Sequence, residues 1–115
     1  LVRDLPPAQI GVAFDLGHAI IVHQDDWPTH FERLKPHLHV AYIKDAHRER
    51  RFVPFGEGEF SQTDYFTRLK RMNYTAPLSL HIEYNWAKPA DRNRENLAVA
   101  LRASLAKTRE WIAAA

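Results

Sequence analysis

Three short apolar runs, each followed by a segment with helical spacing of apolar residues, constrain this chain more than any other feature of its sequence. The runs have the length and aliphatic character of buried strands, and they cover residues 10–15, 38–44 and 78–83. Helical spacing and capping signals follow at about residues 27–34, 61–72 and 91–114, and a long polar loop fills residues 45–60. Three strand–helix pairs predict an α/β fold with a parallel sheet, because parallel strands need a long crossover between them.

Polar and apolar residues alternate within these runs, and the alternation separates the two faces of the predicted sheet. Ser79, His81 and Glu83 alternate with aliphatic residues in the last run, and Asp15 ends the first run after two small residues. One face is therefore apolar enough to pack under helices, whereas the other is small or polar and ends in a carboxylate. This pattern favours a barrel with a polar inner layer, although a doubly wound open sheet also places its site at the carboxyl ends of the strands.

Composition narrows the possible partners. The 115 residues suffice for one modest domain, and a net charge of +2 gives no reason to expect nucleic acid. The longest aliphatic stretch, residues 19–22, is far too short to cross a membrane, and the chain has no cysteine. We expect a cytoplasmic protein without nucleic-acid or membrane partners. The first residue is Leu1 and the only methionine is Met72, so we also expect the chain to be a piece of a longer protein.

Three residues near the predicted strand ends could share one site. Asp15 and Glu83 end two different strands, and His18 follows Asp15 by three residues. The carboxyl ends of parallel strands meet at one edge, where two carboxylates and an imidazole suit a divalent ion such as Mn, Mg, Co or Zn. The same spacing also suits a loop cap, a surface histidine and an arginine-paired glutamate, and spacing alone does not separate the two interpretations.

Four motifs, in order along residues 9–86, resemble the xylose isomerase-like superfamily of sugar isomerases and epimerases. The resemblance lies in a strand end with Asp and His three residues apart, an H-h-K-D strand, a glycine-containing loop and a final iSlH-x-EY strand, which correspond to residues 11–18, 41–45, 55–60 and 78–84. It implies the last three βα units of a (β/α)8 TIM barrel. Residues 1–115 would then form strands six to eight of an incomplete barrel, with the upstream half absent.

The resemblance also implies roles for individual residues. Asp15 and Glu83 correspond to metal ligands, and Glu83 corresponds to the residue that exchanges a proton with the substrate. His18 corresponds to a histidine that binds a substrate oxygen beside the metal. Arg48, in the loop after the second strand, corresponds to an arginine that many epimerases use to bind the substrate.

One position departs from the family pattern, so the sequence does not decide whether the site binds a metal. Epimerases of this superfamily usually have a metal-binding His where this chain has Tyr42, and a phenol stays protonated near neutral pH. His81 faces the same way as Glu83 and could join the ligands or bind substrate; otherwise the site is altered or holds no metal. Lys44 faces inward beside Tyr42, where it could neutralise a substrate oxyanion or phosphate, or pair with Asp15 or Glu83.

The sequence therefore predicts a metal-assisted isomerase or epimerase that moves a proton next to the carbonyl of a small sugar or polyol ketone. The second carboxylate that such a reaction needs would lie in the absent half, so we expect these residues to be inactive alone. Open sheet edges predict association with that half or with further copies of the chain. The alternatives are an endonuclease IV-like DNA repair barrel and a non-catalytic sugar-binding barrel that has lost its metal.

Overall fold

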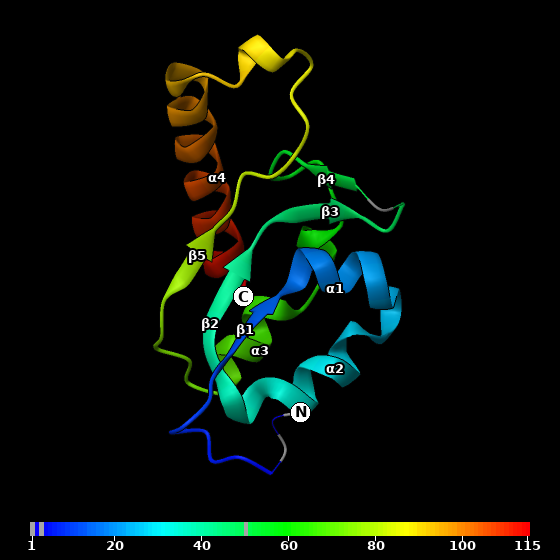
Figure 1. The fold of residues 1–115 in the computed structure, drawn as a ribbon, viewed down its shortest axis with the longest axis vertical. Helices are drawn as coiled ribbons and strands as arrows, with labels where there is room; N and C mark the ends of the chain where they lie inside the picture. The colour runs from blue at the N-terminus through cyan, green and yellow to red at the C-terminus, as the bar shows by residue number, and fades with distance from the viewer. Residues whose placement is uncertain (1, 3, 50) are drawn as a thin grey trace.

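A parallel sheet of three strands organises the molecule (Figure 1). The structure is a computed structural model, and it describes residue 2, residues 4–49 and residues 51–115. The strands are β1 (Val12–Asp15), β2 (Leu38–Ile43) and β5 (Leu78–Leu80), and they lie in the order β1-β2-β5. All three predicted strands are confirmed, although each is shorter than expected. The chain has an α/β fold with a parallel sheet.

The register of the sheet decides which side chains share a face. Asp15 pairs with Tyr42, and Tyr42 pairs with Ser79, so these three residues form one row across the strands. Phe14 pairs with Ala41 on the opposite face, which is the apolar one. The predicted separation into an apolar face and a small or polar face is thereby confirmed.

The segment predicted as a long polar loop contains a second, smaller sheet. Strands β3 (Asp45–His47) and β4 (Arg51–Val53) form an antiparallel pair directly after β2. The prediction of one long polar loop over residues 45–60 was therefore wrong in its first part. Its polar and basic composition concealed the strands, because Asp45 and His47 of β3 and Arg51 of β4 interrupt the apolar pattern that identifies a buried strand. Figure 1 shows this hairpin above the carboxyl ends of β1 and β2.

Helices cover the apolar face of the sheet. They are α1 (Leu16–His23), α2 (Trp27–Leu34), α3 (Tyr65–Arg71) and α4 (Arg94–Ala114), and short 3-10 turns lie at Gln24–Asp26, Lys35–His37, Phe60–Gln62 and Pro89–Asp91. The helix over residues 27–34 is confirmed as predicted. Helix α1 was not predicted, because its residues are almost uniformly apolar and show no 3.6-residue period. None of the described helices has the length and apolar character that a membrane span requires.

Helix α4 buries only part of the face that its sequence predicts. The spacing within residues 91–114 predicts a core face of Leu97, Leu101, Leu105, Thr108 and Ile112. Thr108 is buried as predicted, but Leu101, Leu105 and Ile112 are 39–49% exposed. The buried residues are Ser104 and Thr108, with Trp111 stacked on Phe60 at a ring-centroid distance of 4.7 Å. The small polar pair can be buried because the Thr108 hydroxyl donates to the Ser104 carbonyl oxygen at 2.8 Å.

An aromatic core lies between the sheet and the helices. The Phe31 and Tyr65 rings are fully buried with centroids 5.6 Å apart, and Phe14 of β1 packs edge-on against Phe31 at 5.2 Å. Phe60 meets Tyr65 at 5.8 Å, also edge-on. Trp27 is buried in the same cluster. This core fixes the positions of β1, β2 and α3, and with them the strand ends that carry the polar residues.

Candidate active site

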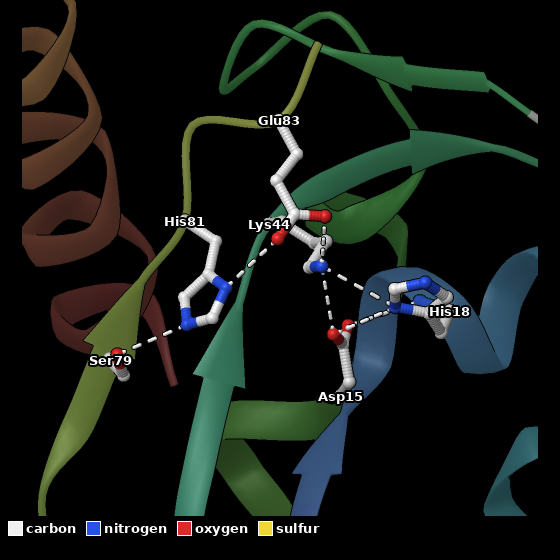
Figure 2. A network of polar contacts seen from close by, with 6 residues as sticks. All are labelled: Asp15, His18, Lys44, Ser79, His81 and Glu83. Carbon is white, nitrogen blue, oxygen red and sulfur yellow. Dashed lines mark hydrogen bonds and ion pairs between the residues drawn. The ribbon is translucent and has the colours of Figure 1, made fainter.

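Five of the six predicted site residues meet at the carboxyl ends of the strands (Figure 2). They are Asp15, His18, Lys44, His81 and Glu83, which we call the strand-end cluster. Lys44 follows Tyr42 by two residues and therefore lies on the same face as the Asp15–Tyr42–Ser79 row. The predicted convergence of Asp15 and Glu83 on one point is confirmed, and the shared partner is Lys44.

The ammonium group of Lys44 lies between the two carboxylates. Its Nζ is 2.9 Å from Oδ2 of Asp15 and 2.5 Å from Oε2 of Glu83, and the Lys44 side chain is 3% exposed. The same nitrogen lies 4.7 Å from the centre of the Phe52 ring. Of the two possibilities that the sequence left for Lys44, pairing with Asp15 or Glu83 is the one observed, and it pairs with both.

Asp15 links the sheet to the first helix. It caps the N-terminus of α1, where its Oδ1 accepts from the backbone N–H of His18 at 3.1 Å. Its Oδ2 contacts Nδ1 of His18 at 2.8 Å, and the His18 ring lies edge-on to Phe52 with centroids 5.0 Å apart. The loop-cap interpretation of Asp15 is therefore correct, and it holds together with a place in the cluster.

Glu83 and His81 follow β5 and complete the cluster. The Nδ1 atom of His81 is 3.2 Å from Oε1 of Glu83, and its Nε2 atom is 3.1 Å from the Ser79 hydroxyl. The pKa of Glu83 is lowered mainly by the hydrogen bond from Lys44. Partial burial raises this pKa, and the contact with His81 lowers it further. Glu83 is therefore ionised at neutral pH and is available as a proton acceptor.

Arg48 lies apart from this cluster. Its Nε atom donates to Oε2 of Glu59 at 2.8 Å, and its Nη2 atom is 3.2 Å from Oδ1 of Asp25. The pKa of Arg48 is raised by these contacts, with the Glu59 hydrogen bond as the first cause. Arg48 lines a separate cavity of about 340 Å³ beside Trp27 and Gln62.

A larger cavity opens beside Glu83. It has a volume of about 550 Å³, and its lining includes Glu83, Phe52, Trp86 and Arg92. Of these residues the sequence predicted only Glu83, and it gave no indication of Phe52 or Arg92. Neither could have been found from spacing, because Phe52 reaches the strand ends through the unexpected hairpin and Arg92 arrives on the loop before α4. An aromatic wall with one carboxylate and one guanidinium suits a small polar molecule.

Asp45 has a structural role next to the cluster. This carboxylate is 1% exposed and accepts backbone N–H bonds of 2.8–3.0 Å from four residues, namely Ala46, Gly56, Gly58 and Phe60. Two of the family-like motifs, H-h-K-D and the glycine loop, thus form one hydrogen-bonded unit. This unit holds the hairpin over the strand ends.

The donor set does not fit the divalent ion that the resemblance implies. No group of three His, Cys, Asp or Glu side chains with the geometry to hold a metal occurs among the described residues. Both carboxylates already bind the Lys44 ammonium, so an ion placed between them would have to displace a buried cation. The Tyr42 ring lies tilted against the His81 ring at a centroid distance of 4.2 Å, and it offers a phenol where an imidazole nitrogen would be needed.

Comparison with known proteins identifies the family. A family described as Xylose isomerase-like TIM barrel matches residues 1–108. This family includes sugar isomerases and epimerases as well as endonuclease IV, and its members often use divalent metals. No curated protein and no solved structure matches the chain. Because the match covers nearly the whole sequence, the chain belongs to the xylose isomerase-like TIM barrel family.

Proposed function

We propose that this chain is part of an isomerase or epimerase that moves a proton on the carbon next to the carbonyl of a small sugar or polyol ketone. The observation that carries the proposal is the position of Glu83, which is ionised, hydrogen-bonded to Lys44 and exposed to the 550 Å³ cavity. A carboxylate at the mouth of a parallel sheet that is ionised and faces a cavity can act as a general base. The three βα units would be the last three of a (β/α)8 barrel.

In the proposed reaction a proton is first removed from the substrate and then returned to it. Glu83 takes the proton from the carbon, and the electron pair of the C–H bond moves toward the carbonyl oxygen to give an enediolate. Return of a proton to the other face or to the neighbouring carbon gives the epimer or the isomer. The second proton carrier would come from another part of the protein, so we expect residues 1–115 to be inactive alone.

The charge on the carbonyl oxygen must be stabilised, because an α-proton is far too weakly acidic for an unassisted carboxylate. Candidate donors among the described residues are Lys44, His18 and His81, which all border Glu83 or Asp15. Arg92 and the rings of Phe52 and Trp86 would bind the remainder of the substrate in the cavity. A sugar fits this lining because its hydroxyl groups bond to charged side chains and its C–H faces pack on aromatic rings.

Hydrogen exchange with solvent tests this proposal directly. The full-length protein, as isolated from its source, is incubated in D2O with a panel of ketoses and smaller hydroxy-ketones, and deuterium at the α-carbon is followed by NMR. We expect exchange with at least one substrate and a loss of about 100-fold or more in Glu83→Gln. Glu110→Gln is the matched control, because Glu110 pairs with Lys107 on the exposed side of α4.

Two other results would support one of the alternative functions in place of the proposed one. Saturable sugar binding without exchange would indicate the non-catalytic barrel, which Tyr42 favours. Cleavage of DNA at abasic sites by the same preparation would indicate the endonuclease IV-like alternative. Exchange that is unchanged in Glu83→Gln would show that another residue carries the proton.

A further inference from the structure

The position of Lys44 is built into the fold. Lys44 directly follows β2, and its Nζ lies between the carboxylates of Asp15, at the end of β1, and Glu83, which follows β5; β1 and β5 are the two edge strands of the sheet. Figure 2 shows the ammonium at the centre of the cluster, with Asp15 below it and Glu83 above it. A lysine that is 3% exposed cannot reorient freely, because its charge would be buried without a partner in most other conformations.

A second element confirms that the fold makes room for this side chain. Gly17 of α1 lies against the aliphatic part of Lys44, and a Cβ at position 17 would be 2.3 Å from Cγ of Lys44. Such a contact is sterically impossible, so the glycine leaves the space that the lysine stem occupies. The Phe52 ring closes the site from the hairpin, with its centre 4.7 Å from Nζ. Helix α1 therefore borders the Lys44 stem and the hairpin borders its ammonium group.

The charges of the cluster are consistent with a resident cation. Two carboxylates face one another through one ammonium, and each carboxylate has a further histidine contact, His18 for Asp15 and His81 for Glu83. The Lys44 ammonium therefore compensates part of the negative charge of the two carboxylates without a bound ion. A divalent ion at the same point would meet the ammonium at close range, where unit charges repel strongly in a partly buried site.

We propose that Lys44 is the permanent cation of this site and takes the place of the divalent metal that the family often uses. Its ammonium has three N–H groups: two bind Asp15 and Glu83, and the third is directed to the region of His18, 3.4 Å away. In the reaction this group donates a hydrogen bond to the substrate oxygen that gains negative charge, while Glu83 holds the transferred proton. This role in the reaction depends on the proposed function, but the occupation of the metal position by Lys44 does not.

Metal titration of the full-length protein tests the inference independently of activity. Mn²⁺ binding is measured by calorimetry for the unmodified protein, for Lys44→Met and for the control Lys107→Met. Lys107 is an exposed lysine of α4 that pairs with Glu110. We expect no specific Mn²⁺ site at the cluster in the unmodified protein or the control, and binding about 100-fold tighter in Lys44→Met because the repulsion is removed. The new site should disappear in Lys44→Met combined with Asp15→Asn.

Two results would overturn the inference. One is stoichiometric Mn²⁺ binding by the unmodified protein that is lost in Asp15→Asn. The other is a folded Lys44→Met variant that gains no metal affinity. If Lys44→Met does not fold, the ¹⁵Nζ signal of Lys44 in the unmodified protein decides the question, since it should persist in Mn²⁺, and paramagnetic broadening of that signal would overturn the inference.

The activity assay separates this inference from the proposed function. If both are correct, deuterium exchange persists after treatment with a chelator and falls by about 100-fold or more in Lys44→Met. Exchange that a chelator abolishes and Mn²⁺ restores would overturn the role of Lys44 while leaving the proposed reaction intact. Without any exchange the reaction is wrong, and the titration still decides whether Lys44 occupies the metal position.

Discussion

Gly17 and Lys44 occupy complementary space: the backbone of Gly17 lies where any larger residue would collide with the Lys44 stem. Gly17 belongs to the first turn of α1, and Lys44 follows β2, so the contact joins two elements that are distant in sequence. The position of the ammonium therefore depends on a residue that carries no functional group.

The first prediction follows from this contact. Gly17→Ala should push the Lys44 side chain away from Asp15 and lower the free energy of unfolding by about 1–3 kcal/mol, the usual cost of overpacking. Urea denaturation measures the effect. In a Lys44→Ala background the same change should cost clearly less, because the collision with the side chain is gone and only the 3.0 Å approach to the backbone oxygen of residue 44 remains. An equal loss in both backgrounds would contradict a direct contact.

The second prediction concerns the ionisation of Glu83. Its pKa is lowered in the folded state, so this group stabilises the fold above its unfolded-state pKa, and the contribution is lost as the pH falls through the folded-state pKa. NMR titration of the Glu83 side-chain carboxyl carbon should show a midpoint below the usual glutamate range. In Lys44→Met the midpoint should rise, because the main cause of the shift is removed. An unchanged midpoint would contradict the ion pair.

The third prediction concerns Asp45, which binds four backbone N–H groups. Asp45→Asn should lower the free energy of unfolding by about 2–4 kcal/mol, because an amide cannot accept all of these bonds and turns a donor toward other donors. Thermal and urea denaturation provide the measurement. Asp64→Asn serves as the control, since Asp64 pairs with Arg68 at the surface and its loss should cost at most about 1 kcal/mol.

The fourth prediction concerns Tyr65, whose hydroxyl is buried without a hydrogen-bond partner among the described residues. Burial raises its pKa, so the group stays neutral at any ordinary pH. Tyr65→Phe should leave the stability unchanged or raise it by up to about 2 kcal/mol, because an unpaired polar group leaves the core. Urea denaturation at neutral pH measures the difference. A loss of more than about 1 kcal/mol would reveal a bond that the hydroxyl makes to water.

The fifth prediction concerns association. Strands β1 and β5 are the two edges of the parallel sheet, and Val99, Leu101 and Ile112 of α4 are 43–58% exposed. Open edges and exposed apolar side chains promote pairing with other chains. We expect residues 1–115 to form dimers or larger species in light scattering at micromolar concentration. A clean monomer would contradict this expectation.

The local sequence determined the strands and the identity of the strand-end residues. The three apolar runs predicted β1, β2 and β5, since alternation with a period of two is a local property of a strand. The expected parallel direction of the strands then predicted that Asp15 and Glu83 would meet, because it places the carboxyl ends of the strands at one edge of the sheet. The family motifs were likewise readable from the order of residues.

Only the tertiary structure decided which residues meet in the strand-end cluster and which groups bind the Lys44 ammonium. The sequence left open whether Lys44 binds substrate or carboxylates, because the answer depends on the register of three strands and on the space left by Gly17. It also predicted a core-facing stripe on α4, of which Thr108 is buried but Leu101, Leu105 and Ile112 are exposed. Periodicity identifies a stripe, but burial depends on which surface packs against it, and that surface is built from residues far away in the chain.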